Sequence, residues 1–218
     1  MDQAQTHYPT AGAKCADLVV HIVGLAFALF GGGILLGLAV GRGSAGQIGS
    51  VAVYAVGMAV MLGCSLAYNF GKAPWRPLLR RFDHAGIFLM IAGSYTPFTT
   101  QSLTGGWAIG MTVGVWTLAL LGVAGKLFLP GLGKKFWVAL YLALGWAVLV
   151  AIKPMIDSVS WVALMLLGIG GLLYSTGVIF YLMKKFHFRR AVWHGHVVAA
   201  AAVQYAAVLV GVVLAGAH

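Results

Sequence analysis

Several polar and ionisable side chains occur in pairs at helical spacing within an otherwise apolar sequence. Asp17 and His21 are four residues apart, and so are Ser65 and Asn69. In a helix this spacing puts both members of a pair on one face. Imidazoles and carboxylates bind zinc and transfer protons, and hydroxyl and amide groups can form hydrogen bonds beside them. The two pairs are therefore candidates for a chemical site.

Two further groups extend this set toward the middle and the end of the chain. Asp83 opens a third apolar run, and Arg190 and His194 share a helical face at the start of the last one. His196 lies about 200° around the helix from His194, so at most one of these histidines can face the site. The residues expected to face one another are Asp17, His21, Ser65, Asn69, Asp83, Arg190 and His194.

The composition places these residues in a membrane. Of 218 residues, 61% are hydrophobic and only 8% are charged, whereas a soluble domain carries about a quarter charged residues. This excludes a disordered chain and a disulfide scaffold and argues strongly against a soluble enzyme. The net charge of +10 comes from short basic clusters between apolar runs, which favours topology setting over nucleic-acid binding.

Apolar runs of about 20 residues are long enough to cross a bilayer as helices. The predicted spans are residues 17–40, 47–70, 83–103, 106–128, 135–153, 158–183 and 192–216. We therefore predict an all-α membrane protein with a seven-transmembrane helical bundle. Residues 1–16 form a cytoplasmic tail and residues 17–218 a single membrane domain in this prediction.

The basic residues predict the orientation, because cytoplasmic loops are enriched in Lys and Arg. Only Arg42 and Lys153 fall on the side opposite the N-terminus. The basic residues on the N-terminal side are Lys14, Lys72, Arg76, Arg80, Arg81, Lys126, Lys134, Lys135, Lys184, Lys185, Arg189 and Arg190. We expect a multi-pass protein of the inner (plasma) membrane with its N-terminus in the cytoplasm and its C-terminus outside. The polar set then lies at the cytoplasmic ends of four spans.

The stretch 80–98 (RRFDHAGIFLMIAGSYTPF) is similar to the third span of the haemolysin III family, the bacterial relatives of the progestin and adipoQ receptors. Residues 65–69 (SLAYN) resemble the end of its second span, and residues 191–194 (AVWH) the start of its last. The family's topology, seven spans with the N-terminus inside, agrees with the orientation expected here.

The resemblance implies a zinc site at the cytoplasmic side. The family places Ser-x-x-x-His on the second span, Asp at the start of the third and His-x-x-x-His at the start of the last. Its three histidines bind the metal, and its Asp and Ser hold the metal's water. Ser65, Asp83 and His194 match this pattern, whereas Asn69 and Arg190 stand where two histidine ligands are expected. Arg cannot ligate zinc and Asn is a poor ligand.

Three interpretations fit this departure. The first is a membrane protein with a degenerate metal site. Such a protein would act in membrane lipid homeostasis or have a pore-associated, cytolytic activity. The second is a zinc-dependent lipid amide hydrolase, like the eukaryotic relatives linked to ceramide hydrolysis, with zinc held by a displaced set such as His21, His194 and Asp83. The third is a b-type haem protein. Zinc content separates the first two, and colour would reveal the third.

The roles of the individual residues follow from the first two interpretations. Ser65 and Asp83 are candidate catalytic residues, and His194 and His21 are candidate metal ligands. Asn69 and Arg190 are candidate cofactor-binding residues, and zinc is the cofactor considered. Without a metal, we expect Arg190 to neutralise Asp83, directly or through water, because an unpaired buried carboxylate is costly. Membrane lipids are the expected partners.

Overall fold

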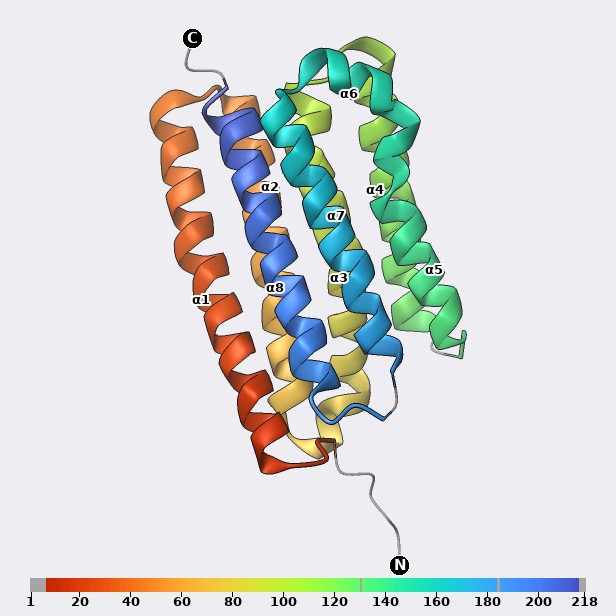
Figure 1. Cartoon of the computed structure of the whole chain (residues 1–218). Coiled ribbons are helices and arrows are strands. Elements are labelled where there is room, and N and C mark those ends of the chain that lie inside the picture. The colour runs from red at the N-terminus through yellow and green to blue at the C-terminus, as the bar shows by residue number, and fades with distance from the viewer. Residues whose placement is uncertain (1–6, 130, 184, 216–218) are drawn as a thin grey trace, which may run out of the picture.

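The protein is a bundle of roughly parallel helices (Figure 1). The structure, a computed structural model, describes residues 7–129, 131–183 and 185–215, and no β-strand occurs in these ranges. The helices are α1 (Ala11–Arg42), α2 (Ala45–Phe70), α3 (Arg76–Gln101), α4 (Gly105–Phe128), α5 (Lys134–Gly145), α6 (Ile152–Ser158), α7 (Trp161–Leu182) and α8 (Arg189–Val208). Short helical turns are η1 (Ala73–Trp75), η2 (Ala147–Ala151) and a terminal π-turn, η3 (Leu209–Val213). The all-helical prediction is confirmed for the described residues.

Within the residues that the structure describes, six helical segments are long and apolar enough to cross a membrane. They are α1, α2, α4, α7, the segment Lys134–Ser158 and the segment Arg189–Val213. The remaining long helix, α3, begins at Arg76 rather than at the predicted residue 83, so it includes Arg80 and Arg81. A multi-pass helical protein is therefore supported, while the seventh span and the orientation remain predictions.

The fifth predicted span, residues 135–153, is a broken helix. Helix α5 ends at Gly145, and η2 and α6 continue the chain. The hydroxyl of Tyr95 on α3 donates to the Gly145 carbonyl at 2.9 Å and accepts from the Val148 amide at 2.7 Å. A side chain from a neighbouring helix thus satisfies the backbone groups that the break releases, as an apolar environment requires.

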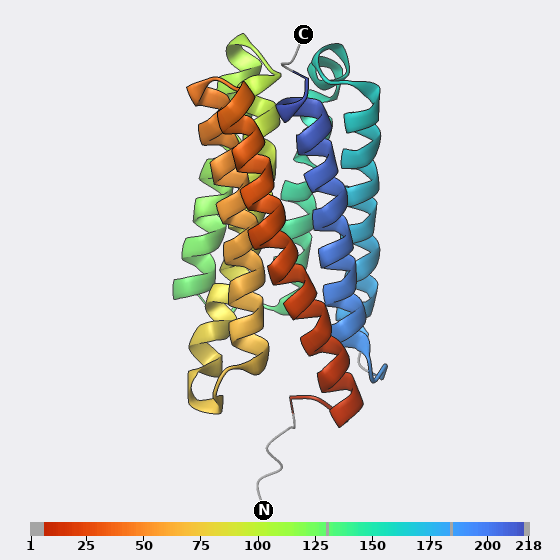
Figure 2. The same cartoon turned by 90° about the vertical axis from the view of Figure 1, so that its left-hand side faces the viewer.

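Close packing between α1, α2, α3 and α8 fixes where their polar ends lie relative to one another. Helix α1 lies across α2 and α8 (Figure 2), and α2 packs most extensively on α3. A Cβ at Gly24 would come within 2.6 Å of a methyl of Val198 on α8, and one at Gly86 within 3.2 Å of the Met61 Cα on α2. Glycine at these positions therefore allows α1 to approach α8, and α3 to approach α2.

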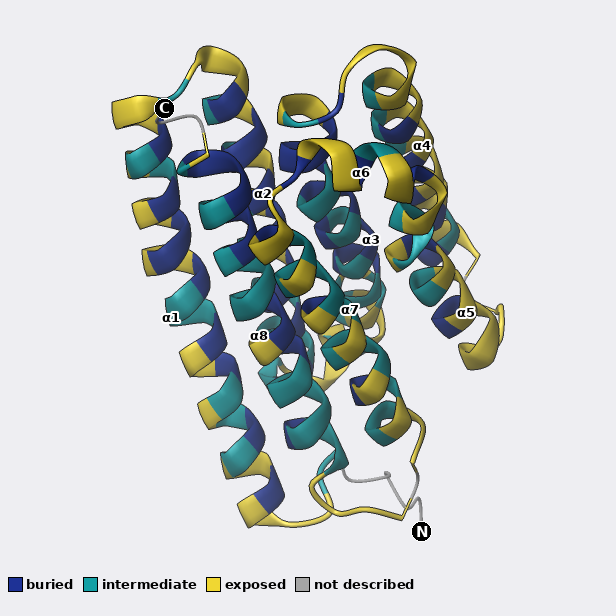
Figure 3. Ribbon diagram, turned by 45° about the horizontal axis from the view of Figure 1, so that its top comes forward, coloured by how far each residue is buried: buried dark blue, intermediate teal, exposed yellow. Residues whose placement is uncertain are grey.

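The outward faces of the helices are apolar. Exposed residues, yellow in Figure 3, lie on the outside of the bundle, and the buried residues line its inner faces. Large exposed hydrophobic side chains include Phe30 on α1, 75% exposed, and Phe128 on α4, 77% exposed. Side chains of this kind suit contact with lipid rather than with water.

Candidate functional site

A buried carboxylate, Asp17, stands at the centre of a hydrogen-bonded cluster between α1, α2 and α8. Its side chain is fully buried, and its Oδ1 accepts from His194 Nδ1 at 2.6 Å. The hydroxyl of Tyr8 donates to Oδ2 at 2.5 Å. His21, one turn farther along α1, donates from Nδ1 to the Asp17 carbonyl at 2.7 Å, and its Nε2 lies 3.2 Å from Ser65 Oγ. Polar side chains of α1 therefore face those of α2 and α8, as predicted.

A second network surrounds Asn69, which is 1% exposed. Its Oδ1 accepts from Arg190 Nη1 at 3.0 Å and from His7 Nε2 at 3.1 Å. Its Nδ2 donates to the Ser65 carbonyl at 3.0 Å and lies 3.5 Å from Ser65 Oγ. The residues that replace two expected histidines thus bond to each other, and Ser65 connects both networks.

The N-terminal residues His7 and Tyr8 belong to this site, although the sequence analysis assigned them to a tail. His7 Nδ1 accepts from Arg190 Nη2 at 3.4 Å, and the Tyr8 ring stacks on Phe70 at 5.7 Å. Burial and the Arg190 charge lower the pKa of His7 to about 4, so the ring is neutral at pH 7. Burial and the hydrogen bond to Asp17 raise the pKa of Tyr8. No helical periodicity marks these residues, so the sequence carried no signal for them.

The prediction of a direct ion pair between Arg190 and Asp83 is wrong. Among the described residues Asp83 makes no ion pair, and Arg190 bonds to Asn69 and His7 instead. His194 bonds to Asp17 because Asp17 lies on the face of α1 that meets α8. Asp83 stays within electrostatic reach of His194 and Arg190 and interacts with the Ser65 hydroxyl.

The two histidines at the start of α8 separate as their spacing predicts. His194 joins the cluster, with a side chain only 12% exposed. His196 bonds instead to the Val192 carbonyl at 2.8 Å, and its ring lies 5.1 Å from that of Phe180.

Asp17, His21 and His194 are also a candidate metal centre, because they offer ligand atoms within 4.8 Å of one another. The structure groups the two histidines with Asp17 rather than with Asp83. Two imidazoles and a carboxylate suit zinc, whose ligands at about 2.0–2.2 Å would lie about 3.3 Å apart. The 2.6 Å between His194 Nδ1 and Asp17 Oδ1 is instead a hydrogen-bond distance. The donor types therefore fit zinc, but the arrangement present is a hydrogen-bonded network.

A cavity of about 640 Å³ begins at this polar end and continues between α3, α5, α7 and α8. Its polar lining includes His21, Ser65, Asn69, Arg80, Asp83, Arg190 and His194. Along α3 the lining runs from Arg80 to Thr99, about 28 Å of helix, against about 30 Å for the hydrocarbon core of a bilayer. Ser65, Asn69, Asp83 and His194 thus line one cavity, as their shared depth and facing predict.

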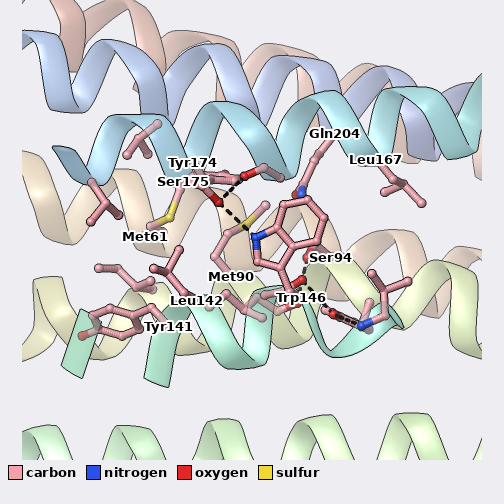
Figure 4. A pocket seen from close by; sticks show the side chains of 18 of the residues that line it. Met61, Met90, Ser94, Tyr141, Leu142, Trp146, Leu167, Tyr174, Ser175 and Gln204 are labelled. Carbon is pink, nitrogen blue, oxygen red and sulfur yellow. Dashed lines mark hydrogen bonds between the residues drawn. The ribbon is translucent and has the colours of Figure 1, made fainter. Parts of the chain in front are cut away.

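Farther in, the cavity walls are mainly apolar, as Figure 4 shows for its middle part. Met61, Met90, Leu142 and Leu167 come from four different helices. Polar groups are few there; several are bonded within the protein, whereas the buried Tyr174 hydroxyl has no hydrogen-bond partner among the described residues. Trp146 Nε1, for example, donates to Ser175 Oγ at 3.0 Å (Figure 4). The cavity therefore combines one strongly polar end with a long apolar body.

Comparison with known proteins agrees with the resemblance seen in the sequence. A family model described as haemolysin-III related matches residues 15–205. A hemolysin-3 homolog of Bacillus subtilis (strain 168) is 34% identical over 204 residues, which cover 92% of this chain and 94% of that protein. The hemolysin-3 of Bacillus cereus is 33% identical over 199 residues, 90% of each chain.

Proposed function

The chain belongs to the haemolysin III-related family, and we propose that it binds a membrane lipid in its cavity and acts in membrane lipid homeostasis. The observation that carries the proposal is the continuity of the polar cluster with the apolar body of the cavity. An amphiphilic molecule matches both parts, with its polar group at the cluster and its chain between α3, α5 and α7. A pocket of this volume is large enough for a small-molecule ligand.

The location of the cluster in the membrane is part of this proposal. The basic residues at the cluster end of the bundle, among them Arg76, Arg80 and Arg81, favour the cytoplasmic face of the inner membrane. A lipid would then place its polar group at the cytoplasmic leaflet and its chain across the bilayer core. Reporter fusions to the C-terminus that are active only in the cytoplasm would contradict this orientation.

Lipid retention by the purified protein tests the proposal. Gly168 lines the cavity and has no atom within 4 Å of a built Cβ, so Gly168→Phe places a ring in the cavity space. Gly114 is exposed on α4 and equally uncrowded, so Gly114→Phe is a matched control on the outer face. Mass spectrometry of lipids retained after extensive detergent washing should detect a specific lipid in wild type and Gly114→Phe. Gly168→Phe should retain several-fold less.

A zinc-dependent lipid amide hydrolase is the second candidate, favoured by the proximity of Asp17, His21 and His194. If zinc is held there, it would supply a Lewis acid and activate a water. Elemental analysis of purified protein decides between the two. About one zinc per chain in wild type, lost in His194→Ala, supports the hydrolase, and a metal-free protein supports the hydrogen-bonded site.

The names of the two relatives suggest a cytolytic activity as a further role for those proteins. A leakage assay on vesicles loaded with a fluorescent dye tests it for this chain. Dye release at low protein-to-lipid ratios would favour a pore-associated activity, whereas intact vesicles together with retained lipid favour lipid homeostasis.

A further inference from the structure

We propose that Ser65 is the nucleophile of a metal-independent acyl-transfer site, with His21 as its general base and a long-chain acyl ester as its substrate. The proposal rests on the proposed lipid cavity, because an acyl chain lodged there brings its carbonyl to the polar end. Ser65 and His21 both line the cavity, and their reactive atoms, Oγ and Nε2, are 3.2 Å apart.

The direction of the hydrogen bonds follows from the partners of His21. Its Nδ1 lies 2.7 Å from the Asp17 carbonyl oxygen, which can only accept, so Nδ1 carries the proton. In a neutral imidazole Nε2 then has the free lone pair. The Ser65 hydroxyl, which also interacts with the Asp83 carboxyl, can then donate to His21 Nε2 at 3.2 Å, which is the arrangement of a serine nucleophile with its base.

The base is held in place by a third group, as nucleophilic catalysis requires. The i, i+4 bond to the Asp17 carbonyl fixes the ring, and the Asp17 carboxylate lies 3.7 Å from the same nitrogen. His21 is only 2% exposed and Asp17 fully buried, so the ring has little room to rotate. Asp17 acts here as a positioning residue.

A hydrogen-bond donor and a positive charge lie beside the nucleophile, and Asn69 Nδ2 donates to the Ser65 carbonyl at 3.0 Å. Asn69 Nδ2 is 3.5 Å from Ser65 Oγ, and the Arg190 guanidinium is bonded to the same amide group. Fixed N–H donors and positive charge in a site largely shielded from water stabilise the negative oxygen of a tetrahedral intermediate. The pair that replaced the expected histidine ligands thus suits acyl transfer better than metal binding.

The reaction balances with the ester and water alone. Ser65 Oγ attacks the acyl carbonyl while its proton passes to His21 Nε2, and the ester C–O bond breaks as that proton passes to the departing alkoxide. Water then attacks the acyl-serine and gives a proton to His21, and that proton returns to Ser65 Oγ as the fatty acid leaves. Zinc bound through His21 Nε2 would occupy the same lone pair, so the two chemistries exclude each other at this site.

A serine on the same helix, outside the cavity lining, provides a matched control. Ser50 on α2 is 4% exposed, and its hydroxyl donates to the Gln47 carbonyl at 2.9 Å, so no imidazole activates it. Ser50→Ala should therefore leave the reactivity of the site unchanged, whereas Ser65→Ala should abolish it.

The test uses the full-length protein in detergent, a long-chain alkyl fluorophosphonate and a metal chelator. We expect an adduct that mass spectrometry maps to Ser65, retained in Ser50→Ala, absent in Ser65→Ala and formed about 100-fold more slowly in His21→Gln. Turnover of a long-chain p-nitrophenyl ester should follow the same order. Should His21→Gln fail to fold, Ser65→Cys provides a second measurement, because its thiol should be alkylated faster than Cys64 in the same chain.

Two outcomes separate this proposal from the lipid-binding one. An unlabelled Ser65 in a protein that retains lipid overturns the acyl-transfer site and leaves lipid binding standing. Labelling at Ser65 without any retained lipid supports the nucleophile and contradicts stable lipid binding. Labelling that the chelator abolishes, or that persists in Ser65→Ala, also overturns the proposal.

Discussion

Arg190 donates from Nη1 to the amide oxygen of Asn69 at 3.0 Å, so the two residues that stand at expected ligand positions are hydrogen-bonded to each other. The bond joins α8 to α2 at the polar end of the cavity. A cation and a neutral amide therefore connect, by direct contact, helices that a shared metal would otherwise connect. The Asn69 amide oxygen and the Arg190 guanidinium therefore satisfy each other by a hydrogen bond that involves no metal.

The Arg190–Asn69 contact should be measurable as a coupling energy. Arg190→Ala should destabilise the protein by about 1.5–3 kcal/mol, because the buried Asn69 oxygen loses a charged donor. The double variant with Asn69→Ala should be less destabilised than the sum of the singles by about 1 kcal/mol. Unfolding of the four proteins in detergent checks this. Strict additivity would show that the contact contributes nothing.

The sequence predicted the helices well because bilayer thickness sets a length that apolar runs reveal. It also predicted that Ser65, Asn69 and His194 share a cavity, since i, i+4 spacing defines a helix face. It did not predict which carboxylate His194 would bond, because spacing within one helix says nothing of the rotation of another. The choice of Asp17 over Asp83 depends on how α1 packs against α8.

Two other features were hidden for related physical reasons. The break after Gly145 is stabilised by Tyr95, which lies 50 residues earlier in the sequence and on another helix. His7 and Tyr8 precede the first helix, where no periodicity reports a facing direction. Contacts between segments, rather than patterns within them, decide such features.

Asp17 should be the most sensitive acidic residue of the chain. Asp17→Ala removes a fully buried carboxylate that accepts hydrogen bonds from Tyr8 and His194. Both donors would be left unsatisfied, at a cost of about 3–5 kcal/mol. Asp157 is exposed, so Asp157→Ala should change the free energy of unfolding by less than about 0.5 kcal/mol. Equal effects of the two substitutions would contradict the central role of Asp17.

Docking of the N-terminal segment should weaken in acid. His7 has a folded-state pKa of about 4, against 6.5 for the free side chain, because burial and Arg190 disfavour its cation. A depressed pKa gives a contribution to stability that is complete above pH 6.5 and is lost as the pH falls toward 4. The difference in unfolding temperature between wild type and His7→Gln should therefore shrink across this window. A difference that is independent of pH would contradict the neutral, docked His7.

Restoring the missing imidazoles should restore a metal site. In Asn69→His with Arg190→His, two new imidazoles would lie beside His194 at the polar end of the cavity, and three imidazoles with an open position are a favourable set for zinc. The substitutions also remove the guanidinium, whose fixed positive charge opposes a bound cation. We expect about one zinc per chain by elemental analysis of the double variant. Asn69→Gln with Arg190→Gln removes the same contact and charge without adding a ligand, and should bind no more zinc than wild type. Equal zinc contents in the two double variants would show that these positions cannot contribute to a metal site in this chain.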